Sequence, residues 1–433
     1  MSDLHDLCKF ASRPITSKAL DELKHYLKAG IPATYTIEEA YNYTHGIDED
    51  ASTTTTPLHL IATHVPKNLS EDEMNVVNDM VTVLFEYGAG WCLTDVNGDT
   101  PGCILIKRGL KETPLYKQIV DAGVRAELLL RKVSEFDMEV LSDDEVPELV
   151  DTEKASLETG LDAEVETGND AAENTKAEAE EEEKKSQTEK EAVDETNDPS
   201  FNQKAYLESK LEYKDDALIT EEGKDGVMMS WETDIMRIGC ETLFKTAEDA
   251  KDVNVLNIGF GMGIIDTMIN NKKPTKHYIC EAHPDVLKKM REEGWFNKPN
   301  VVVLEGRWQD QLTLLLSSGQ VYFDGIYYDT FSEHYQDMLE LFDFVVGLLK
   351  PSGVFSFFNG LGADRQVIYE VYKKLVEIDL GNYGLQVTFK EVQIPQETLK
   401  KGNEKDESVW DDIRRPYWSC PVYYHPEATF QEI

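Results

Sequence analysis

The sequence predicts an α/β protein: a C-terminal domain with a parallel, Rossmann-like sheet, preceded by an all-α domain of ankyrin-like repeats. Three observations predict it. Short apolar strand patterns alternate with helical patterns after residue 199. Thr-Pro turn motifs recur in the first 140 residues, each opening an apolar helix pattern. An acidic stretch separates the two regions. We therefore expect a repeat domain at 1–140, a linker at 141–198 and a sheet domain at 199–433.

The overall charge of the chain limits the partners it can have. Its 433 residues include 83 acidic and 43 basic side chains, for a formal net charge of −40, and 41% are hydrophobic, enough to build cores. Affinity for nucleic acid comes largely from Lys and Arg that displace counterions, so we expect no direct nucleic-acid binding. The charge favours basic partners, although acidity that only keeps the protein soluble explains it equally well.

Cysteine usage and hydropathy exclude several further classes. The six cysteines are far apart, with no Cys-x-x-Cys pair and no Cys/His cluster at zinc spacing, so neither a disulfide scaffold nor a metal site is expected. No stretch approaches the roughly 18 apolar residues that a membrane-spanning helix needs. We expect a soluble, reduced, intracellular protein that binds no membrane.

The repeat domain is predicted from one motif and its return. Residues 56–62 read Thr-Pro-Leu-His-Leu-Ile-Ala, close to the ankyrin signature Thr-Pro-Leu-His-x-Ala, and a second Thr-Pro follows 44 residues later at 100–101. His59 is expected to tie down the turn and to have no catalytic role. Helices at Leu115–Val120 and Ala126–Val133 are expected to cap the stack. Stacked repeats commonly present a docking surface for a protein partner.

The linker is predicted from its composition. Residues 141–200 contain 22 acidic residues, five lysines and no aromatic residue. Such a segment buries too little apolar surface to offset its ordering entropy, so we expect it to be disordered.

The sheet domain is predicted to have seven strands. Five of them alternate with helices, and the last two are expected to form an antiparallel hairpin at one edge. The expected strands are Val253–Ile258, Tyr278–Glu281, Val301–Leu304, Phe323–Asp329, Gly353–Phe358, Gln386–Ile394 and Trp418–Tyr424.

A glycine-rich turn after the first of these strands indicates a cofactor site. The turn reads Gly259-Phe260-Gly261-Met262-Gly263 and leads into a helix from Ile264. Backbone donors at such a turn can approach a cofactor closely, and Glu281 at the end of the next strand can hold a ribose. Dinucleotide sites need a third small residue where Ile264 stands, so the spacing favours S-adenosylmethionine. Asn257 stands where methyltransferases usually have an acid.

Two carboxylates are predicted to form the substrate site. Glu232 follows Met229-Ser230-Trp231, and Asp329 ends the fourth strand, at the sheet edge where ligands collect. A pair of carboxylates suits a guanidinium, whose planar donors bind carboxylates bidentately. Glu333 and Glu340, farther along, are expected on a solvated helix face.

These strings together resemble a known family. Met229–Met236, the glycine turn, Glu281, Glu305–Asp310 and Asp324–Phe331 look like guanidinoacetate methyltransferase over nearly all of residues 200–425. With the repeat domain and acidic linker, the whole chain is similar to the fungal type IV protein arginine methyltransferases, which methylate the internal (delta) guanidino nitrogen.

The resemblance implies a role for each matching residue. Asp329 and Glu232 would be catalytic and hold the guanidinium, with Asp329 the candidate proton acceptor. No metal is implied. The residues implied to contact S-adenosylmethionine are Tyr206, Met236, Gly259, Phe260, Gly261, Met262, Gly263, Ile264, Glu281, Ala282, His283, Trp308, Gln309 and Asp329.

The family also implies a substrate and a location. The substrate would be a basic protein of the large ribosomal subunit, and the enzyme would be cytoplasmic and nuclear. Two other functions stay open from the sequence. One is methylation of a small guanidino metabolite, although a metabolite needs no docking surface. The other is a non-enzymatic ankyrin scaffold, which the intact glycine turn, Glu281 and Asp329 argue against.

Overall fold

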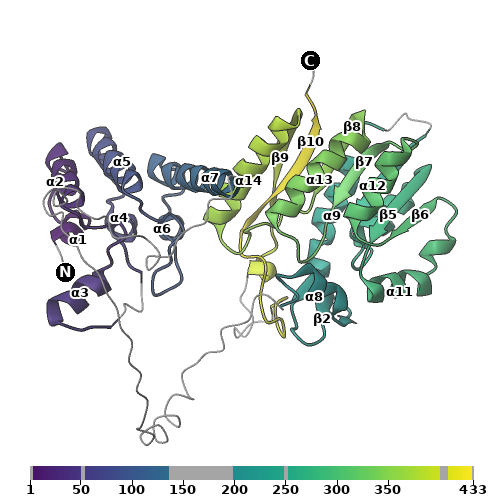
Figure 1. Cartoon of the computed structure of the whole chain (residues 1–433), viewed down its shortest axis with the longest axis horizontal. Helices are drawn as coiled ribbons and strands as arrows, with labels where there is room; N and C mark the ends of the chain where they lie inside the picture. Colours follow the sequence, from purple (N-terminus) through teal and green to yellow (C-terminus); the bar gives the residue numbers. More distant parts are fainter. Residues whose placement is uncertain (1–2, 50–53, 136–197, 248–251, 400–407, 432–433) are drawn as a thin grey trace, which may run out of the picture. The chain divides into compact units, whose positions relative to one another are not determined.

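The computed structural model describes residues 3–49, 54–135, 198–247, 252–399 and 408–431. The predicted linker lies outside these residues except for Asp198. The described chain contains an N-terminal helical region and a C-terminal α/β domain (Figure 1). No helix among the described residues is long and apolar enough to cross a membrane.

Seven helices make up the described N-terminal region, which confirms the all-α prediction for it. The two Thr-Pro motifs begin α4 and α6, with the threonine before the helix and the proline in its first turn, where the missing N–H costs nothing. The helices are α1 (Asp3–Leu7), α2 (Ser17–Lys28), α3 (Ile37–His45), α4 (Pro57–His64), α5 (Glu71–Glu86), α6 (Pro101–Lys107) and α7 (Pro114–Glu135).

His59 ties down the turn at the start of α4, as expected. Its Nδ1 lies 2.8 Å from the Thr56 hydroxyl and its Nε2 lies 3.0 Å from the Leu93 carbonyl oxygen, so the imidazole joins the start of α4 to a neighbouring loop. The two short capping helices, however, are one continuous helix, α7. Gly123 within it leaves room for a close neighbour, since a Cβ there would lie 3.1 Å from the Trp91 ring.

The C-terminal domain has the predicted seven-stranded sheet, in the order β6-β5-β4-β7-β8-β10-β9. Five strands pair in parallel, and β10 pairs antiparallel with both β8 and β9. The strands are β4 (Asn254–Ile258), β5 (Lys276–Glu281), β6 (Val301–Glu305), β7 (Phe323–Tyr328), β8 (Leu349–Phe357), β9 (Leu385–Gln393) and β10 (Val422–Phe430).

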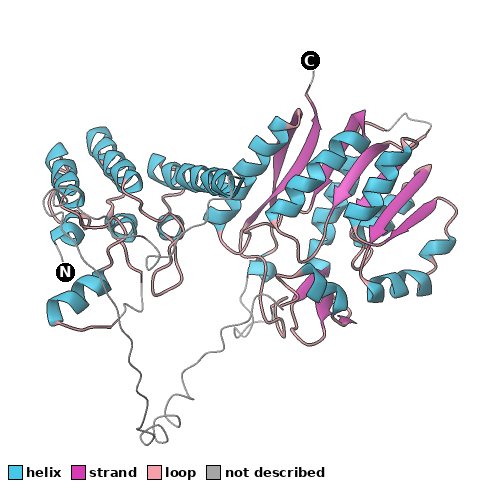
Figure 2. Ribbon diagram, in the orientation of Figure 1, coloured by secondary structure: helices cyan, strands magenta, loops and turns pink. Residues whose placement is uncertain are grey.

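Helices cover both faces of this sheet (Figure 2). Alternate residues of β4 enter different cores: Leu256 packs in one hydrophobic cluster and Val255 in another. The first cluster includes residues of α12 (Trp308–Ser318), α13 (Tyr335–Leu348) and α14 (Gln366–Asn382). The second includes residues of α9 (Thr233–Leu243), α10 (Ile264–Asn271) and α11 (Pro284–Glu292).

Two parts of this domain differ from the prediction. A small antiparallel sheet, β1 (Leu211–Tyr213), β2 (Ala217–Thr220) and β3 (Gly226–Met229), precedes α9, where no strand was predicted. The last strand begins at Val422 and not at Trp418. Before it, the Ser419 N–H donates to the Ala363 carbonyl oxygen (2.8 Å) and not to β9, and Pro421 has no N–H to donate, although its carbonyl oxygen still accepts from the Ile394 N–H (3.0 Å).

Candidate active site

The candidate site lies at the carboxyl ends of β4, β5 and β7, where the order in which successive strands join the sheet reverses. The chain runs from β4 outward to β6 and then returns to place β7 on the other side of β4, which makes this edge the switch point for ligands. Gly259 follows β4, Glu281 ends β5 and Asp329 follows β7. The Asp329 N–H donates to the Ile258 carbonyl oxygen at 2.9 Å, so Asp329 starts its loop beside the glycine turn.

Glycine is required in this turn for two physical reasons. Gly259, Gly261 and Gly263 all have positive φ, at +91°, +54° and +69°. A Cβ on Gly259 would also lie 1.8 Å from the Asp329 carbonyl oxygen. The turn can therefore pass directly beside the strand end that carries Asp329.

A buried hydrogen-bond network takes the place of the acidic residue that methyltransferases usually have at the position of Asn257. The Asn257 side-chain amide donates to the Gly259 carbonyl oxygen (2.7 Å) and to Asp266 Oδ2 (2.8 Å). Asp266 lies 3.0 Å from His277 Nε2, and both side chains are fully buried. Burial raises the pKa of Asp266. The acid that braces the glycine turn thus stands nine residues later in the sequence and acts through Asn257.

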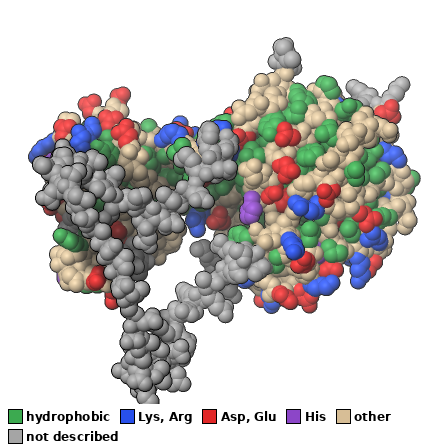
Figure 3. All heavy atoms as spheres, viewed as in Figure 1, with side chains coloured by type: hydrophobic (Ala, Val, Ile, Leu, Met, Phe, Trp, Pro, Cys, Tyr) green, Lys and Arg blue, Asp and Glu red, His purple; other side chains and the backbone are tan. Residues whose placement is uncertain are grey.

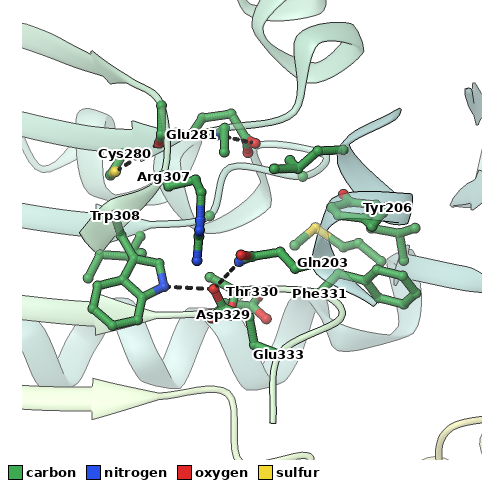
Figure 4. A pocket seen from close by; sticks show the side chains of 18 residues that line it. Gln203, Tyr206, Cys280, Glu281, Arg307, Trp308, Asp329, Thr330, Phe331 and Glu333 are labelled. Carbon is green, nitrogen blue, oxygen red and sulfur yellow. Dashed lines mark hydrogen bonds between the residues drawn. The ribbon is translucent and has the colours of Figure 1, made fainter. Parts of the chain in front are cut away.

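A narrow cavity of about 60 Å³, the glycine-loop cavity, opens against this turn (Figure 4). Its walls include Tyr206, Glu281, Trp308 and Asp329, and the exposed side chain of Arg307 extends into it. A nucleoside-sized ligand requires that Arg307 move aside. Because that side chain reaches solvent, it can do so without disturbing the core.

The residues of this cavity fit a nucleoside cofactor. The Glu281 carboxylate accepts hydrogen bonds from the backbone N–H groups of Phe260 (2.9 Å), Ala282 (2.7 Å) and His283 (2.7 Å), which fix its orientation. Burial raises its pKa. A backbone hydrogen bond from Gly261 also reaches this carboxylate, so a ribose hydroxyl would have to share it with, or displace, one of these backbone donors. The positive-φ glycines provide the close backbone approach.

The structure brings only part of the predicted cofactor set to this cavity. Seven of the predicted residues line it: Tyr206, Gly259, Gly261, Glu281, Ala282, Trp308 and Asp329. The other seven do not line it: Met236, Phe260, Met262, Gly263, Ile264, His283 and Gln309.

Several of the non-lining residues support those that line the cavity. His283 is fully buried, and its Nε2 lies 3.0 Å from the Tyr206 carbonyl oxygen, which ties α8 (Gln203–Glu208) to the end of β5. The Phe260 ring packs edge-on against Trp295 with centroids 5.2 Å apart. Met236 is fully buried in the core under the sheet. They shape the cavity from behind.

A second, larger cavity of about 540 Å³, the carboxylate cavity, contains both predicted catalytic residues. Glu232 and Asp329 line it, together with loops at 357–364 and 415–417. Five residues line both cavities and form the wall between them: Val227, Asp329, Thr330, Phe331 and Glu333. Asp329 is thus the predicted catalytic carboxylate that reaches both spaces.

The two carboxylates are arranged to receive a cation. Glu232 is 3% exposed and accepts a hydrogen bond from the Tyr417 hydroxyl. Burial raises the pKa of Glu232, and the nearby charge of Asp329 raises it further. Burial, with a smaller contribution from the charge of Asp266, raises the pKa of Asp329 to about 7. A guanidinium between them would relieve this repulsion.

One carboxylate at this site was assigned wrongly from the sequence. Glu333 is not on a solvated helix face. Its side chain accepts hydrogen bonds from Trp308 Nε1 (2.7 Å) and Gln203 Nε2 (2.5 Å), as Figure 4 shows, and it lies in the wall between the cavities. Tyr417 was not predicted at all. Within the described residues no group of three His, Cys, Asp or Glu side chains could hold a metal ion.

Comparison with known proteins identifies the family. The family model for guanidinoacetate N-methyltransferase matches residues 199–429. A protein arginine N-methyltransferase 2 of Debaryomyces hansenii is 61% identical over 440 residues, covering all of both chains. The Saccharomyces cerevisiae protein of that name is 47% identical, covering 99% of this chain and 100% of the relative. That of Yarrowia lipolytica is 42% identical, covering 99% and 97%. This chain therefore belongs to the family of fungal protein arginine N-methyltransferases, with a C-terminal domain of the guanidinoacetate N-methyltransferase family.

Proposed function

We propose that this enzyme transfers a methyl group from S-adenosylmethionine to the delta nitrogen of an arginine in a protein. The observation that carries the proposal is the shared wall: Asp329 lines both the glycine-loop cavity, which would take a nucleoside once Arg307 moves aside, and the carboxylate cavity, which suits a guanidinium. When bound, the cofactor supplies an electrophilic methyl group on a sulfonium. The chain itself must place the nitrogen and receive its proton.

Glu232 and Asp329 divide this work. Together they bind the planar guanidinium through paired hydrogen bonds, which aims the nitrogen at the wall between the cavities. Asp329 Oδ2 is buried and has no hydrogen-bond partner among the described residues, so it is available to the substrate. As the nitrogen forms its bond to carbon, it loses a proton, and Asp329 accepts it. A proton acceptor with a pKa near 7 is well matched to this step at neutral pH.

Two considerations favour the delta nitrogen of a protein arginine. Guanidinoacetate is methylated on the nitrogen that bears its carbon substituent, and the delta nitrogen is the corresponding atom of arginine, so one site geometry serves both. The carboxylate cavity, at about 540 Å³, falls within the 300–1,000 Å³ typical of drug-sized ligands and accommodates more than a small metabolite.

The same proposal includes a substrate class. A chain with a net charge of −40 suits a basic substrate, which we take to be a protein of the large ribosomal subunit. The N-terminal helices would provide an ankyrin-like docking surface for it. The enzyme would be present in both cytoplasm and nucleus. On the face seen in Figure 3, acidic and basic side chains are interspersed over the described surface. Because the described part of that face shows no purely acidic patch that could select one arginine, we assign the choice of the arginine to the carboxylate cavity.

Fragment mass spectrometry tests this function. Ribosomal proteins and, separately, guanidinoacetate are incubated with the enzyme and labelled S-adenosylmethionine. Label on the delta nitrogen of an arginine is expected. Label only on a terminal guanidino nitrogen would overturn the position, label only on guanidinoacetate would favour a metabolite enzyme, and label on neither would favour the scaffold.

The raised pKa values predict a pH dependence. A carboxyl whose pKa is raised to about 7 is protonated below that pH and ionised above it, and only the ionised form accepts a proton. We expect log kcat/KM for a basic peptide to rise with pH up to about 7 with a slope of at least one, because Glu232, whose pKa is also raised, must be ionised as well to bind the guanidinium. Initial rates from pH 5.5 to 9 measure this. A flat profile down to pH 5.5 would contradict a proton acceptor with this pKa.

A further inference from the structure

Glu333 lies at the junction of three structural elements. Its Oε1 accepts from Gln203 Nε2 (2.5 Å), in the first residue of α8, and from Trp308 Nε1 (2.7 Å), in the first residue of α12. Its Oε2 accepts from Thr330 Oγ1 (2.6 Å) and from the hydroxyl of Tyr328, the last residue of β7. One carboxylate thus satisfies four donors.

These four partners belong to both halves of the site. Gln203 and Trp308 line the glycine-loop cavity, and α8 also carries Tyr206, another residue of its wall. Thr330 adjoins Asp329 in the wall shared with the carboxylate cavity. Glu333 itself lines both cavities. It therefore connects the elements that surround the cofactor with the loop that carries the proton acceptor.

We propose that Glu333 is a positioning residue, which couples binding of S-adenosylmethionine under α8 to the placement of the Asp329 loop. Glu333 acts through its hydrogen bonds. An ordered cofactor wall and a correctly placed Asp329 then depend on the same carboxylate. The effect of Glu333 on cofactor binding does not depend on which substrate is methylated. Its effect on the placement of Asp329 rests on the proposed function.

The four donors around Glu333 allow the effect of its hydrogen bonds to be separated from the effect of its negative charge. The Gln203 amide and the Trp308 indole can only donate through their N–H groups, whereas the hydroxyls of Tyr328 and Thr330 can turn and accept. A glutamine at position 333 can keep its oxygen toward the two N–H donors and its NH₂ toward the two hydroxyls. Glu333→Gln therefore preserves all four bonds without the charge, and Glu333→Ala removes them all.

Calorimetric titration of the full chain with S-adenosylmethionine tests the effect of Glu333 on cofactor binding. We expect Glu333→Ala to weaken the Kd at least about tenfold, the effect of losing one or two net hydrogen bonds. Glu333→Gln should stay within about threefold of the parent, and so should Glu340→Ala, which removes an exposed glutamate of α13. Unchanged affinity in Glu333→Ala, or equal losses in the Ala and Gln variants, would overturn the proposal.

Gln203→Ala tests the same connection with Glu333 in place, and it should weaken the Kd by itself if α8 is held through this bond. Gln203→Ala breaks only the bond to α8. If α8 is held through Glu333, the Kd of Gln203→Ala combined with Glu333→Ala should equal that of Glu333→Ala alone. Additive losses would show that the two side chains act separately and would refute the coupling.

Turnover on a basic peptide tests the effect of Glu333 on the placement of Asp329. We expect Glu333→Ala to lower kcat even when S-adenosylmethionine is saturating, and Glu333→Gln to restore it. A kcat equal to the parent's at saturation would confine Glu333 to cofactor binding and overturn the coupling to Asp329. The calorimetric titration needs no arginine substrate, so its result can be interpreted even if the proposed function is wrong.

Discussion

Replacing Asp329 by asparagine is expected to lower kcat for arginine methylation by about 10²–10⁴-fold, the usual contribution of a general base. The amide keeps the shape of the side chain but cannot accept the proton that the nitrogen loses. It also removes one of the two carboxylates proposed to bind the guanidinium and leaves Glu232 as the other. Single-turnover rates with a labelled methyl donor and a basic peptide measure the loss.

Two comparisons separate this role from a structural one. Asp329 lines the glycine-loop cavity, but asparagine keeps the shape of its side chain and leaves the glycine turn and Glu281 in place, so the Kd for S-adenosylmethionine should change far less than kcat in Asp329→Asn. Glu232→Gln should raise KM for the peptide more than it lowers kcat, since its carboxylate anchors the guanidinium and Tyr417 fixes it from behind. If Glu232→Gln loses more kcat than Asp329→Asn, the two roles are exchanged.

The part of the site that could be predicted follows from sheet geometry. Gly259, Glu281 and Asp329 each stand at the end of a buried apolar strand, and the ends of parallel strands meet at one edge of a sheet. That these three residues lie close together could therefore be predicted without knowing how the helices pack on the sheet. The strand alternation likewise predicted the seven strands, because each pattern is local.

The part that could not be predicted depends on contacts between distant residues. Tyr417 lies 185 residues after the Glu232 that it contacts, and Gln203 lies 130 residues before Glu333. Nothing in the local pattern marks either pair. Glu333 also precedes a helix that begins at Tyr335, where an acid is ordinarily solvated. Only the fold shows that four donors surround it.

Asn257 shows how a departure from a family's usual residue can conceal a structural requirement that is still met. The position lacks the usual acid, yet the turn is still braced, because Asn257 donates both to the Gly259 carbonyl oxygen and to the buried Asp266. A spacing of nine residues gives no local signal for this pair. The sequence around Asn257 therefore does not reveal that the turn is braced.

The largest structural effect is expected from Gly259→Ala. A Cβ at this position would lie 1.8 Å from the Asp329 carbonyl oxygen, so the end of β7 must move. The positive φ costs about 1–2 kcal/mol and forced overpacking a further 1–3 kcal/mol. Displacement of Asp329 by about 1 Å should lower kcat about a hundredfold, and the displaced turn should weaken binding of S-adenosylmethionine as well.

Gly294→Ala is the matched control for this prediction. Gly294 also has a positive φ (+76°), but a Cβ there would meet nothing within 4 Å. It should show only the conformational cost of about 1–2 kcal/mol in urea unfolding, with unchanged cofactor affinity and turnover. Equal losses of activity in the two variants would mean that backbone strain alone accounts for them. A selective loss in Gly259→Ala would establish that close approach between the glycine turn and the Asp329 strand is what the site requires.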